Sequence, residues 1–125
     1  MLRFLLLVLL VFAFPGVADA APGPSSFRVG TGVACALVSP ATVVCSGTRS
    51  GSMAIRAAGT PASTGMRARA TARTPRLRTG ETWRRGGISC TARAGEVSCT
   101  NGSGAVLVLG ADRVVVLAPD AAVSP

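Results

Sequence analysis

The sequence contains no histidine, lysine or tyrosine, and only five of its 125 residues are acidic. General acid–base catalysis uses side chains whose pKa lies near the working pH, and these three residue types are the usual ones beside the carboxylates. A serine nucleophile would have neither a histidine nor a lysine as its base. No glycine-rich stretch is followed by the lysine of a phosphate-binding loop. These absences argue against an enzyme, and the sequence predicts no cofactor.

Few carboxylates remain as candidates for hydrolysis. Beyond residue 20 they are Glu81, Glu96, Asp112 and Asp120. Paired-carboxylate hydrolysis needs two of them within about 5 to 10 Å. Nothing in the sequence brings Glu81 and Glu96 together, so solvated surface charges are the favoured interpretation. A deep cleft lined by both would favour an enzyme, whereas an arginine face without a cleft would favour a binding module.

Aromatic residues are also scarce, with one tryptophan and four phenylalanines. Trp83 lies beside Arg84 and Arg85, and an indole next to guanidinium groups could act as a stacking platform for a ligand. The favoured alternative is that Trp83 anchors a small core while the arginines are solvated.

The first 20 residues have the pattern of a secretory signal peptide. Arg3 precedes an apolar run of 11 residues, from 4 to 14, and Ala18-Asp19-Ala20 provides the small-residue cleavage pattern. A membrane-spanning helix needs about 20 apolar residues, so we expect cleavage after Ala20 and no transmembrane segment in the product. The expected location is secreted or periplasmic.

The rest of the chain is long enough for one small domain. We expect a flexible lead-in over residues 21–26 and a single domain over residues 27–118. Within it, an irregular arginine-rich linker covers about residues 57–80. A flexible tail over residues 119–125 completes the prediction.

Four cysteines in an exported chain predict two disulfides. Zinc sites use cysteine pairs separated by two to four residues, whereas nine residues separate Cys35 from Cys45 and eight separate Cys90 from Cys99. No metal site is therefore expected. We favour the local pairs Cys35–Cys45 and Cys90–Cys99, and the sequence alone leaves the two long-range connectivities open.

The cysteines mark a diverged internal duplication. One copy reads Val-Ala-Cys35, then Cys45-Ser-Gly, then residues 51–55; the other reads Ile-Ser-Cys90, then Cys99-Thr-Asn, then residues 104–108. Each copy has the pattern of a β-hairpin followed by a third strand. The expected fold is all-β: a small, disulfide-stapled antiparallel sandwich or barrel-like domain built from two hairpin-plus-strand units.

Local cysteine pairing fixes the register of both hairpins. Leu37 then lies opposite Val43, and Arg93 lies opposite Glu96 as a favourable cross-strand charge pair. After the Asn101-Gly102 turn signal, residues 105–109 and 113–117 predict a closing hairpin. Because both runs are apolar on both faces, we expect these strands to be central or covered.

The stretch from Arg78 to Asn101 resembles the C-terminal signature of a family of small exported bacterial proteins of unknown function. In that family Gly-x-x-Trp precedes Cys-Thr-Ser, Gly-Leu-Thr-Cys-Thr-Asn and Gly-His-Gly-Phe, followed by Ser-Arg. Residues 27–36, Phe-Arg-Val-Gly-Thr-Gly-Val-Ala-Cys-Ala, are similar to its N-terminal Phe-x-x-Pro-Ser-Gly-Asn-x-x-Cys. The resemblance covers about half of the chain and implies an exported, disulfide-bonded β-domain without assigning a mechanism.

The chain departs from that family in two respects. Family members commonly have more cysteines than the four of this chain, and a longer middle section. Ala105 stands at the position of the family's histidine, Val106-Leu107 replace the Gly-Phe, and Gly110-Ala111 replace the Ser-Arg. Any role that depends on that histidine is absent here.

All 13 basic residues are arginines, and the net charge of +8 favours anionic partners. Arg67, Arg69 and Arg73 alternate with alanines and would share one face of an extended strand. With Arg84 and Arg85 they are the candidate anion-binding residues, although a solvated edge protected by charge is the simpler interpretation.

The function expected from the sequence is an exported, non-enzymatic structural or binding module that contacts an anionic polymer or lipid headgroups. The alternative is a small secreted hydrolase or enzyme inhibitor with an unrecognised site. Nucleic acid is not an expected partner, because the chain has few aromatic side chains for stacking on bases.

Overall fold

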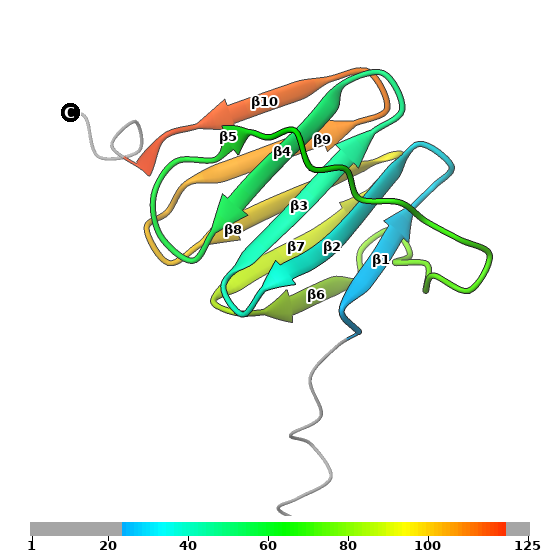
Figure 1. Ribbon diagram of the computed structural model, residues 1–125, viewed down its shortest axis with the longest axis horizontal. Coiled ribbons are helices and arrows are strands. Elements are labelled where there is room, and N and C mark those ends of the chain that lie inside the picture. The colour runs from blue at the N-terminus through cyan, green and yellow to red at the C-terminus, as the bar shows by residue number, and fades with distance from the viewer. Residues whose placement is uncertain (1–23, 120–125) are drawn as a thin grey trace, which may run out of the picture.

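The chain forms two packed layers of antiparallel β-structure. The computed structural model describes residues 24–119 and contains ten strands in two five-stranded sheets (Figure 1). Sheet A consists of β1 (Ser26–Val29), β2 (Val33–Ser39), β3 (Thr42–Gly47), β4 (Gly51–Arg56) and β5 (Ala62–Ser63). Sheet B consists of β6 (Thr82–Arg85), β7 (Ile88–Arg93), β8 (Glu96–Asn101), β9 (Val106–Gly110) and β10 (Val114–Leu117). Each sheet is a meander in which consecutive strands pair, so the predicted all-β sandwich of two units is confirmed.

The predictions for the chain ends fall largely outside the described residues. These are the signal peptide at residues 1–20, most of the lead-in at 21–26 and the tail from residue 120. Strand β1 begins at Ser26, the last residue of the predicted lead-in. Strand β5 interrupts the segment expected to be an irregular linker.

Both disulfides join directly opposite residues of neighbouring strands. Cys35 in β2 is bonded to Cys45 in β3, and Cys90 in β7 to Cys99 in β8, with Cα–Cα distances of 4.1 and 4.0 Å. All four cysteines are buried in the core between the sheets. The local connectivity is thus confirmed, and the two bonds indicate a chain that folds in an oxidising environment.

Each sheet begins with a strand that the sequence did not indicate, β1 in sheet A and β6 in sheet B. Phe27 in β1 lies opposite Cys35, and Trp83 in β6 lies opposite Cys90. The two aromatic rings meet between the sheets, with their centroids 5.0 Å apart. The Trp83 Nε1 group donates a hydrogen bond of 2.7 Å to the Pro24 carbonyl oxygen, which satisfies its one polar group. The Phe27–Trp83 contact therefore joins β1 and β6, one edge strand of each sheet.

Two expectations about sheet B were wrong. Strand β10 is an edge strand, paired only with β9 among the described strands, because it is the last strand of the meander. Arg93 does lie opposite Glu96, but the Glu96 carboxylate forms its ion pair with Arg113, at 2.9 Å from Nε to Oε2. Arg113 reaches it because β9 brings Gly110, three residues earlier, next to Glu96.

The Asn101 side chain connects the two sheets. Its Nδ2 group donates to the carbonyl oxygen of Arg56, the last residue of β4, at 2.9 Å, and to that of Gly59, which follows β4, at 2.8 Å. Its Oδ1 atom accepts from the backbone N–H groups of Ser103 and Ala105 in the turn before β9. The turn signal read from Asn101 therefore also fixes how sheet B meets the end of β4.

Reduction of the disulfides should destabilise the sandwich strongly. The bonds span 10 and 9 residues, and closing loops of this size contributes about 2.5 to 3 kcal/mol each in the chain-entropy model. We expect thermal melts with and without a thiol reductant to differ by more than 10 °C, since about 1 kcal/mol shifts the midpoint of a small domain by roughly 4–8 °C. An unchanged midpoint in protein shown by mass to be fully reduced would contradict this expectation.

Two glycines with left-handed backbones form a matched pair for testing the contact between the β6–β7 turn and the β2–β3 turn. Replacing either Gly86 (φ 59°) or Gly95 (φ 70°) by alanine costs about 1–2 kcal/mol, because side chains disfavour this backbone conformation. A Cβ atom at Gly86 would in addition collide with the Pro40 carbonyl oxygen, whereas one at Gly95 has nothing within 4 Å. In urea unfolding, Gly86→Ala should lower the free energy of unfolding clearly more than Gly95→Ala. Equal losses of stability would refute the close approach of Gly86 to Pro40.

Candidate functional site

Residues 64–81, here called the crossing segment, pass over the outer face of sheet A and around its β1 edge to sheet B. Figure 1 shows the chain leaving β5, passing in front of β4, β3 and β2, and turning back beyond β1. Ala68 is buried on this face against Ala34 and Val44. Its N–H group donates a hydrogen bond of 2.9 Å to the Oγ atom of Ser46, the one buried polar side chain among residues 24–119. Ser46 Oγ also bonds Ser52 Oγ at 2.7 Å, so the segment is anchored to two strands.

The crossing segment then covers the edge of sheet A. The Arg28 N–H group donates to the Pro75 carbonyl oxygen at 2.9 Å, and the Leu77 N–H group donates to the Arg28 carbonyl oxygen at 2.8 Å. Arg28 and Arg76 form an isolated parallel bridge. Strand β1 is thereby protected from pairing with another chain.

Two arginines from distant parts of the sequence are fixed beside this segment. Arg28, half-buried in β1, donates from Nε to the Thr74 carbonyl oxygen at 3.1 Å. Arg67, exposed in the crossing segment, donates from Nη2 to the Gly47 carbonyl oxygen at 2.9 Å. Each guanidinium group is oriented by one hydrogen bond and retains further N–H donors, because arginine has five.

These two arginines line one groove of about 470 Å³ between sheet A and the crossing segment. We call it the basic groove. Its walls are Arg28, residues 30–34 and Ser46 and Thr48 from the sheet, and Arg67, Ala68 and residues 70–72 from the crossing segment. No carboxylate and no aromatic side chain lines it.

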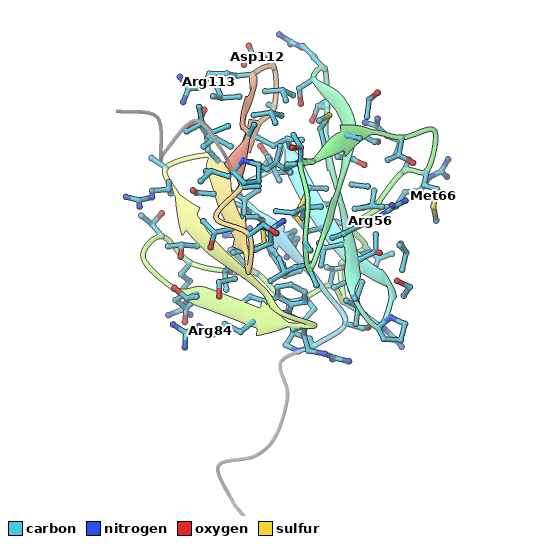
Figure 2. The ribbon with its side chains drawn as sticks, turned by 90° about the vertical axis from the view of Figure 1, so that its left-hand side faces the viewer. Arg56, Met66, Arg84, Asp112 and Arg113 are labelled. Carbon is cyan, nitrogen blue, oxygen red and sulfur yellow. A yellow bond between two sulfur atoms is a disulfide. The ribbon has the colours of Figure 1, made fainter. Side chains whose placement is uncertain are left out.

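The other candidate arginines are divided between the two faces of the sandwich. Arg69 and Arg73 are exposed on the crossing segment. Arg84 is exposed on β6, and Figure 2 places it on the opposite side of the molecule from Met66, the neighbour of Arg67. Arg84 and Arg85 line a separate surface depression with the Gly86-Gly87 turn. The run of arginines from 67 to 85 therefore does not form one face.

Two predictions about these residues need correction. Residues 67–73 do not form a strand, because the crossing segment is held by Ser46 and by isolated contacts instead of a sheet ladder. Trp83 is 3% exposed, so its ring packs in the core against Phe27 and offers no surface for stacking with a ligand. The core-anchor interpretation of Trp83 is the correct one.

The carboxylates are engaged separately. Glu81 accepts a hydrogen bond of 2.7 Å from the Arg78 N–H group, and Glu96 pairs with Arg113. Glu81 precedes β6 and Glu96 begins β8, with β7 between them. Neither lines the basic groove. Among residues 24–119, no three His, Cys, Asp or Glu side chains gather into a group that could hold a metal ion.

Sequence reasoning missed Arg28 and Ser46 as parts of the candidate site. A signal was present, because most positions around Val44 on the outward face of sheet A carry small side chains: Ala34, Ala36, Ser46, Ser52 and Ala54. Such a face lets another stretch of backbone approach closely. The stretch that covers this face is selected by contacts between residues far apart in the sequence, which no local pattern encodes. Ser46 and Ala68 are 22 residues apart, and Arg28 and Thr74 are 46 residues apart.

The chain matches no family model, no curated protein and no solved structure. The resemblance of its Arg78 to Asn101 stretch to an exported bacterial family stays a prediction. Within the part that the structure describes, no helix is long and apolar enough to span a membrane.

Loss of the Ser46 hydroxyl should release the crossing segment. In Ser46→Ala the buried Ala68 N–H group loses its acceptor, at a cost of about 1–3 kcal/mol. We expect faster hydrogen exchange at Ala68 and faster tryptic cleavage after Arg67 and Arg69. Ser52→Ala is the matched control, because it removes the partner of Ser46 but keeps the bond to Ala68. Equal exchange at Ala68 in the parent and in Ser46→Ala would show that this bond does not hold the segment.

Proposed function

We propose that this chain is an exported, non-enzymatic binding module that contacts anionic polymers or lipid headgroups through its arginines. The observation that carries the proposal is the charge balance of the folded part. Residues 24–119 contain twelve arginines against Glu81, Glu96 and Asp112. Ten of these arginines are exposed, and Arg28 and Arg85 are intermediate. An excess of fixed positive charge on a small surface attracts anionic partners and speeds their association.

Export is supported by three features. The first 20 residues have the composition of a signal peptide, the two disulfides suit an oxidising compartment, and the sequence resembles a family of exported bacterial proteins. A secreted or periplasmic location would bring the arginines into contact with the anionic components of a cell envelope.

A non-enzymatic role is supported by the positions of the carboxylates. Glu81 and Glu96, the one pair considered for hydrolysis, have different partners, and neither lines the basic groove. Binding by charge alone needs no such pair.

Binding to anionic vesicles and to a polyanionic glycan tests the proposal. The parent protein should bind vesicles of phosphatidylglycerol but not of phosphatidylcholine, and the affinity should fall steeply between 20 mM and 200 mM salt, because exposed charges are screened over about 10 Å at 0.1 M. The variant Arg67→Gln/Arg69→Gln/Arg73→Gln should bind roughly 100-fold more weakly, since each basic residue at an anionic surface contributes about 1 kcal/mol.

The matched control removes three exposed arginines elsewhere, as Arg49→Gln/Arg84→Gln/Arg93→Gln. We expect it to weaken vesicle binding less than tenfold, because these arginines are spread over the β3–β4 turn and sheet B. Thermal melts check that both variants remain folded. The proposal is overturned if the parent fails to bind at 20 mM salt, or if the crossing-segment variant binds as tightly as the parent.

A further inference from the structure

The basic groove has the dimensions of a binding site for a small group. Its volume of about 470 Å³ lies within the range of roughly 300–1,000 Å³ that is usual for ligand pockets. One wall comes from the β1–β2 turn and from β3, and the other from the crossing segment. A ligand inside would touch both and would thus be recognised by parts of the chain that only the fold brings together.

The two guanidinium groups in the groove are preoriented. Arg28 uses its Nε–H group on the Thr74 carbonyl, and its two Nη groups have no protein partner among residues 24–119. Arg67 uses Nη2 on the Gly47 carbonyl and retains its Nε–H group and Nη1. Because each side chain is already ordered, a ligand does not have to meet the full entropic cost of ordering it.

The rest of the lining selects the class of ligand. The hydroxyls of Thr31 and Thr71 add polar groups, whereas the Thr48 hydroxyl donates to the Gly32 carbonyl oxygen at 3.2 Å. The lining has no carboxylate to neutralise the arginines. Nucleic-acid bases bind by stacking on aromatic side chains, which the groove lacks. The lining therefore favours a compact anion over a nucleobase.

Among compact anions, a phosphate group matches the donors best. A carboxylate has two oxygens in one plane, which one guanidinium fork can satisfy. Arg28 belongs to the sheet wall and Arg67 to the crossing-segment wall, and Thr31 and Thr71 add one hydroxyl to each wall. A tetrahedral phosphate can direct different oxygens to each wall at once.

We propose that the basic groove binds the phosphate group of an envelope component, a phosphodiester polymer or a phospholipid headgroup, between Arg28 and Arg67. This inference rests on the proposed function, because it names the anion and the site through which the module binds. It goes further by separating one specific site from the general positive charge of the surface.

Titration of the ¹⁵N-labelled protein with inorganic phosphate tests the site directly. At constant ionic strength set with chloride, we expect saturable amide shifts concentrated in residues 30–34, 46–48 and 67–72. Shifts spread evenly over exposed arginines outside the groove, such as Arg49, Arg93 and Arg113, would overturn the site.

Two matched pairs of variants separate the groove from net charge. Ala70→Glu adds a carboxylate to the lining, and Ala94→Glu adds one at the exposed β7–β8 turn; both change the net charge equally and neither removes a side-chain hydrogen bond. Arg67→Gln removes a groove guanidinium, and Arg93→Gln removes an exposed one elsewhere. We expect phosphate binding to weaken at least tenfold for Ala70→Glu and Arg67→Gln, and less than twofold for their controls. Equal effects within each pair would refute the proposal. Ala70→Glu keeps the bond between Arg67 and Gly47, so its comparison with Ala94→Glu decides the outcome even if Arg67→Gln loosens the crossing segment.

The source of the phosphate is decided by two further probes. Soluble poly(glycerol phosphate) and phosphatidylglycerol vesicles carry the same phosphodiester group. The probe that binds with higher affinity, and that shifts the groove signals or competes with inorganic phosphate there, identifies the source. If vesicles bind with steep salt dependence but inorganic phosphate leaves the groove signals unchanged, the groove assignment fails and the charge-driven function stands. If neither binds, both fail.

Discussion

The sandwich depends on one row of side chains from each sheet that meet between the layers. In sheet A the row passes from Phe27 through the Cys35–Cys45 disulfide, and in sheet B from Trp83 through Cys90–Cys99. A domain of this size buries too little apolar surface to be strongly stable by packing alone. The covalent bonds restrict the unfolded chain, and the Phe27–Trp83 contact closes the sheets at one edge. The remaining strands extend each sheet outward from these rows.

The sequence predicted the parts of the fold that local chemistry determines. The cysteine spacing and period-two pattern placed β2–β4 and β7–β9, with Leu37 correctly opposite Val43. Strands β1, β5 and β6 were missed because they have only four, two and four residues, too few for a period-two pattern to stand out. Strand β10 was expected to be covered because its valines suggest burial on both faces. In a meander the last strand must be an edge, whatever its composition.

The candidate site was predictable in composition but not in geometry. The run of arginines was visible, yet the fold divides it at Trp83, whose burial directs Arg84 to the outer face of sheet B. On the other side, Ala68 and the Ser46 hydroxyl direct the crossing segment over sheet A. The groove lies between this docked segment and sheet A. Arg28, one of its two cations, lies outside the run altogether and joins it through the Thr74 carbonyl.

The two arginines of the groove also bear on the stability of the crossing segment. Each links the segment to sheet A by one hydrogen bond, Arg67 to the Gly47 carbonyl oxygen and Arg28 to the Thr74 carbonyl oxygen. These bonds add to the anchor that Ser46 and Ala68 provide. A phosphate bound between the two walls would contact both arginines and add a further link between segment and sheet. By linkage, binding would then stabilise the docked segment by the same free energy by which docking improves the site.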